Sequence, residues 1–285
     1  MPSRLPEWFR RPYRGAAARS RVDGVLKGLN LHTVCESAAC PNKCECWARG
    51  TATFLILGNL CTRNCRFCAV GHGSPAPPDP DEPGRVARAA REMKLRFVVV
   101  TSVTRDDLPD GGATHFAATI RALHEILPDS QVEVLTPDFQ GQEEPLRTVL
   151  AAGPAVFNHN LETCERLTPQ IRSGADYRRS LGVLAAAARR ADHGTAIKSG
   201  IMLGLGETEQ ETADLLRDLR DHGVTIVTIG QYLPPSPGHW PLDRYATPAE
   251  FIRWEDRARQ EFGFTQVVSS PLARSSYLAE TAASA

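Results

Sequence analysis

The sequence alternates short apolar runs with amphipathic segments, and this alternation limits the fold more than any other feature. The apolar runs are typical of buried parallel strands; they occupy residues 51–58, 95–103, 131–137, 155–162, 195–205 and 225–233. The predicted helices follow them, at residues 84–94, 112–127, 142–152, 176–193, 207–222 and 247–262. Strict alternation of this kind predicts a parallel sheet covered by helices. Because six units are two short of a closed eight-stranded barrel, we expect an α/β fold that forms an open, partial (β/α)6 barrel of the TIM type.

The composition excludes several classes of protein. The 285 residues carry 33 basic and 33 acidic side chains, so the formal charge is zero. A nucleic-acid binder with a strongly basic face needs an excess of Lys and Arg, so we expect no nucleic-acid partner. No run approaches the roughly 18 apolar residues of a membrane span, and the start, MPSRLPEWFRRPYRG, lacks the apolar core of a secretory signal. We therefore expect a cytoplasmic protein with no membrane partner.

Two segments outside the alternation lack a regular period. Residues 1–30 show little apolar patterning, which indicates an extended basic arm; its arginines are Arg4, Arg10, Arg11, Arg14, Arg19 and Arg21. Residues 74–83 contain five prolines, which neither a helix nor a central strand accommodates. We expect this second segment to be a stiff connecting loop.

Seven of the eight cysteines fall between residues 35 and 68. A reduced cytosolic chain of this length has little use for a disulfide framework, so thiols at this density indicate a metal site. Cys61, Cys65 and Cys68 form a C-x3-C-x2-C loop after the first predicted strand. Three thiolates on so short a loop can hold three irons of a cubane cluster and leave the fourth iron open to a ligand. The alternative is a closed zinc site, with the ligands Cys40, Cys44, Cys65 and Cys68.

A second set of three cysteines precedes the first predicted strand. Cys35, Cys40 and Cys46 follow a C-x4-C-x5-C spacing, and two such sets suggest two clusters, each short of one thiolate. Cys44 is then spare, although the spacing alone leaves it open as a replacement for Cys40 or Cys46. Cys164 stands apart from both sets and is expected to be a small buried apolar residue.

Polar side chains gather where the predicted strands end. In parallel α/β barrels the reactive groups lie at the carboxyl ends of the strands and in the loops that follow. Besides the C-x3-C-x2-C loop, these places hold residues 101–107, 158–162 and 198–207, and Gln231. We expect a single mouth that contains all of them.

Longer motifs extend the C-x3-C-x2-C signature, which is typical of radical S-adenosylmethionine enzymes. In chain order they are HTVCESAACPNKCECW, GTATFLILGNLCTRNCRFCAV, VVVTSVTRDDLPDGGATHF, VLTPDFQG, FNHNLET, KSGIMLGLGET, TIGQYLPPSPGHWPLDRY and SPLARSSY. On these motifs the chain resembles the lipoyl synthase family from about residue 20 to residue 278. The resemblance implies an N-terminal extension over 1–50 with auxiliary cluster ligands, a radical barrel over 51–264, and a C-terminal extension over 265–285 with the RSSY motif.

The resemblance also implies two [4Fe-4S] clusters and their roles. Cys61, Cys65 and Cys68 would hold the cluster whose open iron binds S-adenosylmethionine, the source of a 5′-deoxyadenosyl radical. A second cluster would be consumed as the sulfur source; its ligands are implied to be Cys35, Cys40, Cys46 and a serine of RSSY. We place that serine at Ser276, with Ser275 as the alternative. A serine oxygen is a harder ligand to iron than a thiolate and is lost more readily, which suits a cluster that must come apart.

Further residues match motifs that contact S-adenosylmethionine in the family. Arg105, Asp107, Gly111 and Gly112 would lie near the methionyl end, where a helix N-terminus with an acidic cap is the alternative. The ribose hydroxyls would be contacted by Asn160 and Glu162. Arg178 and Lys198 are candidates for carboxylate or substrate contacts, with a salt bridge as the alternative. In the turn near adenine, the matching residues are Gly204 and Glu207.

The implied reaction is the insertion of two sulfur atoms, at C6 and C8, into an octanoyl chain that is amide-linked to a lysine of a carrier domain. The implied carriers are the lipoyl domains of 2-oxoacid dehydrogenases and the glycine-cleavage H protein. A low-potential electron donor and an iron–sulfur carrier that rebuilds the second cluster are also expected. The alternatives are another sulfur-inserting radical enzyme resembling biotin synthase, an iron–sulfur electron carrier or sensor, and a zinc module.

Overall fold

The computed structural model describes residues 5–9, 16–37, 40–49, 51–192 and 194–279. Its main sheet has eight strands in the order β1-β2-β5-β6-β7-β8-β9-β10. The strands are β1 (His32–Thr33), β2 (Thr51–Ile56), β5 (Phe97–Ser102), β6 (Gln131–Leu135), β7 (Val156–Asn158), β8 (Ala196–Leu203), β9 (Ile226–Gln231) and β10 (Gln266–Ser269). Every neighbouring pair from β2 to β10 is parallel, whereas β1 pairs with β2 in the antiparallel direction.

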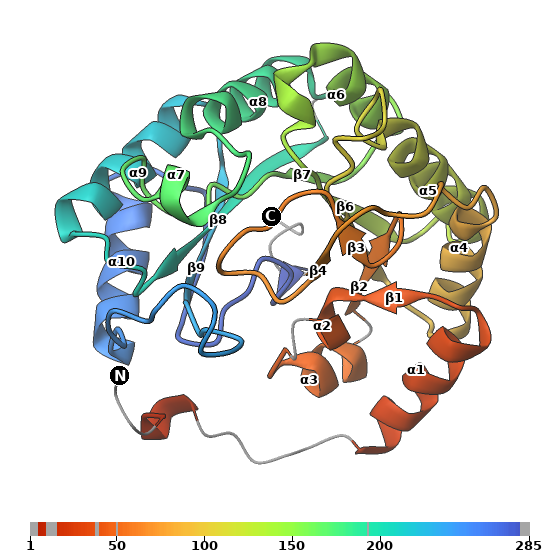
Figure 1. Cartoon of the computed structure of the whole chain (residues 1–285), viewed down its shortest axis with the longest axis horizontal. Coiled ribbons are helices and arrows are strands. Elements are labelled where there is room, and N and C mark those ends of the chain that lie inside the picture. The colour runs from red at the N-terminus through yellow and green to blue at the C-terminus, as the bar shows by residue number, and fades with distance from the viewer. Residues whose placement is uncertain (1–4, 10–15, 38–39, 50, 193, 280–285) are drawn as a thin grey trace.

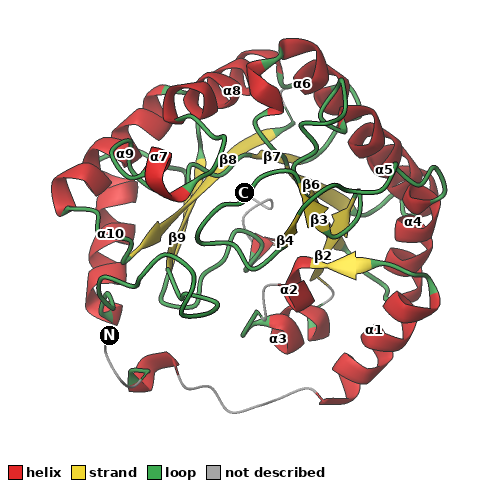
Figure 2. Cartoon of the chain, viewed as in Figure 1, coloured by secondary structure: helices red, strands yellow, loops and turns green. Residues whose placement is uncertain are grey.

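The helices form an outer ring around the curved sheet (Figure 1). After each parallel strand the chain returns through a helix, and Figure 2 shows these helices outside the strands. They are α4 (Glu82–Glu92), α5 (Ala113–Ile126), α6 (Glu143–Leu150), α8 (Tyr177–Arg190), α9 (Glu209–Asp221) and α10 (Pro248–Gln260). The short elements are η1 (Glu7–Phe9), η2 (Phe139–Gly141), α7 (Thr168–Ile171), and the two-stranded sheet β3 (Leu60–Cys61) with β4 (Gly71–His72).

Local sequence signals account for where these helices begin and which face they bury. In α8, Tyr177, Leu181 and Leu184 are buried at the spacing of one helix face. The Asp176 side chain accepts a hydrogen bond from the Arg179 backbone N–H and so caps the start of α8. The strands of the main sheet bury nearly every residue, since helices cover one side and further chain segments fill the other.

The predicted α/β fold is confirmed, and six strands and six helices lie where the periodicity places them. The sheet does not close on itself, because β1 and β10 are its two edges. The prediction missed β10, a strand of four residues that extends the parallel sheet beyond β9. So short a run lacks the length by which periodicity distinguishes a strand from a loop.

The expectation of an extended N-terminal arm is wrong for the residues that the structure describes. Residues Ala16–Gly28 form the helix α1, which contacts α3 (Lys43–Ala48) and α4. Val22 and Leu26 of α1 are buried one turn apart, and their burial in the core stabilises a helix whose apolar pattern is weak. The expected basic arm includes Arg4, Arg10, Arg11 and Arg14, which lie outside the described residues.

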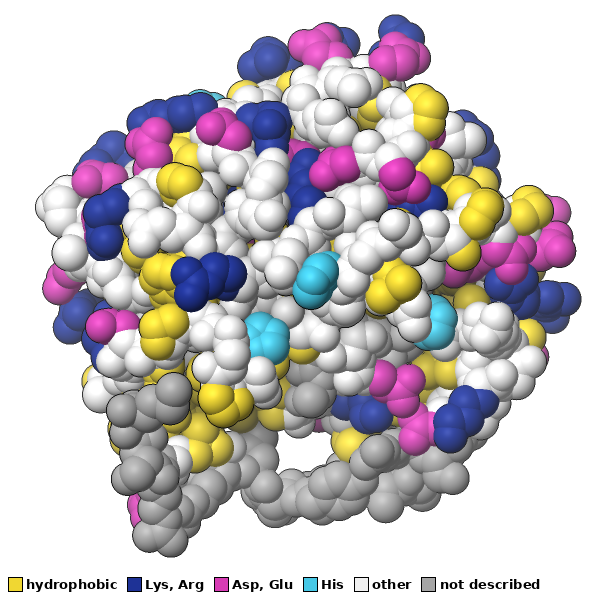
Figure 3. Space-filling model, viewed as in Figure 1, with side chains coloured by type: hydrophobic (Ala, Val, Ile, Leu, Met, Phe, Trp, Pro, Cys, Tyr) yellow, Lys and Arg dark blue, Asp and Glu magenta, His cyan; other side chains and the backbone are white. Residues whose placement is uncertain are grey.

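The surface charge and the hydropathy of the helices agree with what the composition predicts. On the face seen in Figure 3, basic and acidic side chains are interspersed around the rim. Within the described ranges, no helix is both long enough and apolar enough to span a bilayer.

Candidate active site

A cavity of about 730 Å³ lies at the carboxyl ends of the parallel strands. Its walls come from β2, β5, β8 and β9, from the loops that follow β6 and β7, and from both ends of the chain. Both cysteine sets contribute to its lining, with the side chains Cys35, Cys40, Cys46, Cys61, Cys65 and Cys68. The structure therefore brings together at one mouth the two sets that the spacing distinguished.

The loop from Cys61 to Cys68 is fixed by backbone hydrogen bonds at both ends. The Thr62 N–H donates to the Thr104 carbonyl at 3.1 Å, and the Arg66 N–H donates to the Ile171 carbonyl at 2.8 Å. Cys61 lies in β3, which pairs with β4 beyond the loop. These bonds tie the loop to the residues that follow β5 and to the end of α7.

Arg63 adds an ionic anchor to the same loop. Its guanidinium donates to Asp106 at 2.6 and 2.8 Å and to Asp138 at 2.8 and 3.0 Å. Arg179 of α8 also donates to Asp138, at 2.9 Å. Burial by itself raises the pKa of Asp138, but the hydrogen bonds and charge of Arg63 outweigh it and hold that pKa well below its ordinary value. The cysteine loop is thus attached to the ends of β5 and β6 through one side chain.

A loop between β9 and α10 packs against the cysteine loop from the other side. The Trp240 N–H donates to the Arg66 carbonyl at 2.8 Å, and the Arg66 guanidinium lies 4.5 Å from the centre of the Trp240 ring. The His239 ring Nε2 lies 3.1 Å from the Cys68 carbonyl oxygen. The loop of three cysteines is therefore held between β5, β6 and this cover.

Cys35 is buried and the other thiols of the two sets are partly buried, and their electrostatics suit a bound cation. Burial, together with the neighbouring Cys65 and Cys61, raises the pKa of Cys68 to about 11. Cys35 likewise reaches about 11 through burial and the proximity of Cys40. Thiolates at these positions need a positive partner, which iron supplies on binding. The donor set therefore fits metal ligation.

The cysteine spacing left two kinds of metal site open, an iron–sulfur cluster and a single zinc ion. Among the described residues, no three His, Cys, Asp or Glu side chains converge as ligands of one metal ion. In a cubane each thiolate binds a different iron, so the thiolates surround the cluster without converging on one point. The four-thiolate zinc alternative also requires Cys44, which does not line the cavity.

Helix geometry separates Cys44 from Cys46. Both lie on α3, two positions apart, and residues with that spacing point to different sides of a helix. Cys46 lines the cavity, as does Cys40 in the turn before α3. Cys35 lies on α2 (Val34–Ser37) and is buried. The placement thus favours Cys40 and Cys46 over Cys44 as ligands, and Cys164 is buried as a small apolar residue away from both sets.

The C-terminal serines reach the same cavity. Ser275 and Ser276 both line it, together with Arg274, whose charge acts on Cys40. The Asn160 Nδ2 donates to the Ser275 Oγ at 2.6 Å. Within the described part of the chain the Ser276 hydroxyl has no hydrogen-bond partner, so it is the serine that remains available to a ligand.

Asn160 and Glu162 are the predicted S-adenosylmethionine contacts that line the cavity. The Asn160 Nδ2 also lies 3.0 Å from the Glu162 Oε1. Burial raises the pKa of Glu162, and the charge of Arg172 opposes that rise. Glu162 has a positive φ of 65°, a backbone conformation that residues other than glycine rarely adopt. Such strain is typical of functional sites.

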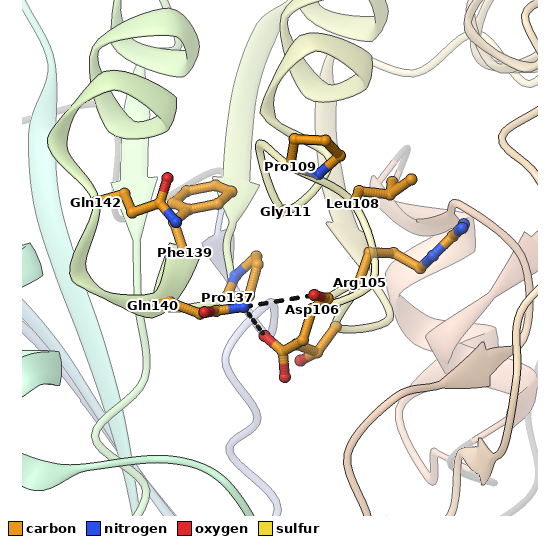
Figure 4. Close-up of a pocket in the computed structure, with 10 residues that line it drawn as sticks. Arg105, Asp106, Leu108, Pro109, Gly111, Pro137, Phe139, Gln140 and Gln142 are labelled. Atoms are coloured by element: carbon orange, nitrogen blue, oxygen red, sulfur yellow. Dashed lines mark hydrogen bonds between the residues drawn. The ribbon is translucent and has the colours of Figure 1, made fainter.

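The loop after β5 gives its predicted residues other partners. Arg105 is buried, and its guanidinium donates to Asp107 at 2.8 Å. Arg105 and Gly111 line a separate small pocket beside η2, where Gln140 lies next to Asp106 (Figure 4). Gly112 has a φ of 90°, and a Cβ added there would come within 2.3 Å of Leu57. Arg105, Asp107, Gly111 and Gly112 do not line the large cavity.

The remaining four predicted contacts also lie outside the cavity lining. Arg178 is exposed and pairs with Glu165 at 2.7 Å. The Lys198 Nζ is buried and lies 2.9 Å from the Glu133 carboxylate. The Glu207 carboxylate accepts the Gly204 and Leu205 N–H groups, each at 2.8 Å, and so closes the turn between β8 and α9.

Asn42, Arg172 and Arg274 are among the polar cavity residues to which the sequence analysis gives no role. Burial lowers the pKa of Arg172, and the Glu162 carboxylate opposes that shift. Arg172 lies in a loop without a recognised motif, so the sequence held no signal for it. Asn42 and Arg274 lie inside the quoted cysteine and RSSY motifs, and their positions beside the predicted ligands were the available signal.

Comparison with known proteins gives one family. The Radical SAM superfamily profile matches residues 55–219. The lipoyl synthase of Methylococcus capsulatus is 55% identical over 281 residues, which are 98% of this chain and 86% of that protein. The lipoyl synthase of Caldanaerobacter subterraneus subsp. tengcongensis is 54% identical over 280 residues, 98% of this chain and 97% of that protein.

Solved structures show the same fold at low sequence identity. Methylornithine synthase aligns with a TM-score of 0.58 and 12% identity, over 88% of this chain and 85% of that one. The FeFe-hydrogenase maturase of Carboxydothermus hydrogenoformans aligns with a TM-score of 0.60 and 14% identity, over 82% of this chain and 65% of that one. The fold, the paired cysteine sets and the full-length relatives agree, and the chain belongs to the lipoyl synthase family of the radical S-adenosylmethionine superfamily.

Proposed function

We propose that this chain inserts two sulfur atoms, at C6 and C8, into an octanoyl chain carried on a lysine of a lipoyl-carrier protein. One observation carries the proposal: a single cavity is lined by both cysteine sets and by the C-terminal serines. A sulfur source and a radical source must both reach the same alkyl chain, so they have to face one space. The family to which the chain belongs supports the same reaction.

Cys61, Cys65 and Cys68 would hold the first [4Fe-4S] cluster, with its open iron toward S-adenosylmethionine. When bound, that cluster supplies an electron that cleaves S-adenosylmethionine and yields a radical able to take hydrogen from an unactivated carbon. The protein's part is to hold the loop rigid before the reaction, and Arg63 does so through Asp106 and Asp138.

Asn160 and Glu162 would orient the nucleoside. Their side chains lie at the cavity, and an amide and a carboxylate can donate to and accept from a pair of ribose hydroxyls. The backbone strain at Glu162 is consistent with a carboxylate that the fold holds in one direction. Correct orientation limits the radical to the intended carbon.

Cys35, Cys40, Cys46 and Ser276 would hold the second [4Fe-4S] cluster as the sulfur source. The Ser276 oxygen has no competing hydrogen bond within the described residues, so it is available to iron. An oxygen ligand is released more readily than a thiolate, which lets the sulfur source be dismantled during turnover.

The rest of the lining suits an apolar substrate. Its apolar side chains include Val103, Leu135, Ile201, Met202 and Leu233. Each buried methylene of an octanoyl chain gains about 0.8 kcal/mol on transfer from water. A bound octanoyl chain would displace water from the cavity and so protect a radical from side reactions.

The carriers would be octanoylated lipoyl domains of 2-oxoacid dehydrogenases or the glycine-cleavage H protein. A low-potential electron donor and an iron–sulfur carrier that restores the second cluster complete the set of proposed partners. The interspersed surface charge gives no ground for a nucleic-acid partner.

Two cysteine variants test the division of labour. Under anaerobic conditions with reductant, S-adenosylmethionine and an octanoyl-lysine peptide, Cys35→Ala should still form 5′-deoxyadenosine but insert no sulfur, and Cys65→Ala should do neither. Mass spectrometry of the peptide and chromatography of the nucleoside measure both outcomes. Cys44→Ala is the matched control and should retain both activities. Normal sulfur insertion by Cys35→Ala would show that the sulfur source lies elsewhere.

A further inference from the structure

The C-terminal segment, defined here as residues 270–279, runs along the inner side of the curved sheet. Leu272 and Ala273 are buried at its start. At its far end Ala279 packs against Phe97, Val99 and Val156, near the amino ends of β5 and β7. The segment thus passes from the carboxyl side of the sheet, where the cavity lies, toward the opposite side.

Two strand glycines leave room for this segment. A Cβ added at Gly230 of β9 would come within 2.3 Å of the Ala273 carbonyl oxygen. A Cβ added at Gly200 of β8 would come within 3.1 Å of the Ser275 Oγ. A side chain at Gly230 would therefore displace the segment's backbone, whereas one at Gly200 would first meet Thr228 and Asn160, at 2.7 and 2.8 Å.

The N-terminal cysteine segment holds the C-terminal segment from the other side. The Asn42 Nδ2 donates to the Leu272 carbonyl oxygen at 2.6 Å, across 230 residues of sequence. Asn42 is only 1% exposed, so water cannot replace this bond in the folded protein. The Tyr277 hydroxyl lies 3.1 Å from the Glu45 Oε1 and forms a second contact between the same two segments.

These two contacts flank the predicted serine ligand. Leu272 precedes Ser276 by four residues and Tyr277 follows it directly, while Asn42 and Glu45 lie between Cys40 and Cys46. A segment near a chain end loses much conformational entropy when it is ordered, so its position depends on such bonds.

We propose that Asn42 is a positioning residue: its side-chain amide latches the C-terminal segment onto the cysteine segment and so places Ser276 beside Cys35, Cys40 and Cys46. The role given to Ser276 rests on the proposed function. The latch itself does not, because it is made entirely by residues of this chain before any cluster binds.

Tryptic cleavage after Arg274 in the full-length, metal-free protein tests the latch. Asn42→Ala removes the donor and leaves the Leu272 carbonyl buried without its partner. Cleavage should become about tenfold faster, because losing a buried hydrogen bond raises the population of the open segment by this order. Tyr277→Phe removes the hydroxyl that contacts Glu45 and should accelerate cleavage about threefold. Asn59→Ala, at an exposed asparagine, is the matched control and should cleave at the wild-type rate.

A cooperative thermal transition checks that each variant is folded. If folded Asn42→Ala is cleaved after Arg274 at the wild-type rate, the proposal is wrong. If Asn42→Ala does not fold, the cleavage rate of Tyr277→Phe is the test instead. Cleavage of Tyr277→Phe at the wild-type rate would then overturn the proposal.

A spectroscopic comparison separates the latch from the proposed function. In anaerobically reconstituted protein, the electron paramagnetic resonance signal of the cluster on Cys35, Cys40 and Cys46 should change in Asn42→Ala and match that of Ser276→Ala. In Asn42→Ala, the rate of 5′-deoxyadenosine formation in the absence of carrier should stay within twofold of the wild-type rate. If Ser276→Ala itself gives the wild-type signal, the serine assignment fails, whereas the cleavage rates still decide whether Asn42 latches the segment.

Discussion

Lys198 is a buried charged residue inside the barrel, and it is paired with a residue of opposite charge. It lies on the same side of β8 as Gly200 and Met202, which line the cavity, because side chains alternate along a strand. Its Nζ lies 3.0 and 2.9 Å from the two Glu133 oxygens on β6, and the Asn158 amide donates to the same carboxylate at 2.9 Å. The charge that the sequence analysis offered to a ligand is neutralised here by a residue 65 positions away.

Breaking this buried pair should be costly. Lys198→Met leaves the Glu133 carboxylate without its cation and should lower the free energy of unfolding by about 3–5 kcal/mol. The double variant with Glu133→Leu should recover most of that loss, because no unpaired charge remains. Urea titration of the metal-free chain measures both. Arg178→Ala breaks the exposed pair with Glu165, which solvent screens, and should leave the free energy of unfolding nearly unchanged. Equal losses for Lys198→Met and Arg178→Ala would contradict the burial argument.

His159 is a second buried polar residue at the cavity. Its Nδ1 lies 2.9 Å from the Thr136 carbonyl oxygen, which only accepts, so Nδ1 carries a proton and Nε2 is the unprotonated nitrogen of the neutral ring. Burial, assisted by the charge of Arg172, lowers the pKa of His159 from 6.5 to about 4. The folded protein therefore keeps this ring neutral in mildly acidic solution.

This shift predicts a specific loss of stability in acid. Between pH 6.5 and about 4 the unfolded chain takes up a proton at His159 that the folded chain does not. Stability should therefore fall as the pH decreases through that window, by up to about 3 kcal/mol from this residue. In His159→Gln the decline should be smaller by that amount, which unfolding titrations at several pH values measure. Parallel pH profiles for the two proteins would falsify this account.

At the scale of elements, local signals and tertiary packing act together. The helix α9 begins with a capping box, in which the Thr208 Oγ1 accepts the Glu211 N–H at 3.1 Å and the Glu211 carboxylate accepts the Thr208 N–H at 2.8 Å. This start places Glu207 just before α9, where it closes the turn after β8. A helix cap thus helps to define the rim of the candidate site.

Removal of the cap should therefore have a measurable effect. Thr208→Ala should lower the free energy of unfolding by about 1 kcal/mol, because it removes the Oγ1 that accepts the Glu211 N–H, whereas the Thr208 backbone N–H can still donate to Glu211. Thr148→Ala in α6 is the matched control, because the Thr148 hydroxyl only donates back to the Glu144 carbonyl within the helix. Denaturant midpoints compare the two. A larger loss in the control would assign the stability to mid-helix contacts instead of the cap.

At the scale of the whole molecule, two segments that are distant in sequence, residues 34–46 and 273–277, meet at the cavity of the barrel. The sheet has free edges at β1 and β10, and the segments that close the cavity come from residues 34–46 and 270–279. The C-x3-C-x2-C set lies on the barrel, whereas the proposed second cluster site would need contacts between residues 34–46 and the RSSY segment, which are distant in sequence.

Iron content should report this division. Anaerobically reconstituted protein should hold about eight irons and eight sulfides per chain, as two cubanes. The triple variant Cys35→Ala, Cys40→Ala, Cys46→Ala should retain about half of each, and Cys44→Ala should retain all. Colorimetric iron and acid-labile sulfide assays measure the content. Zinc in place of iron, with no labile sulfide, would exclude both clusters.

Removing the iron with a chelator should lower the melting temperature, because the clusters bind only the folded chain.

The alternation of apolar runs was enough to predict six strands and six helices from the sequence alone, because strand and helix periods are local properties of the chain. Spacing likewise separated two cysteine sets, since three residues on one short loop cannot spread far apart. The missed elements, α1 and β10, carry weak patterns and depend on burial against distant residues. The sequence also predicted that Asn160 and Glu162 lie at the site, because both follow the end of a strand, and both line the cavity.

Tertiary structure decided which polar side chains were already engaged. The sequence contains Lys198, Arg105 and Arg178 as free charges, but only folding pairs them with Glu133, Asp107 and Glu165. The same holds for Asn42, whose partner Leu272 lies 230 residues away. Periodicity and spacing are encoded in neighbouring residues, whereas pairing across the barrel follows from how the whole sheet curves and what its interior must neutralise.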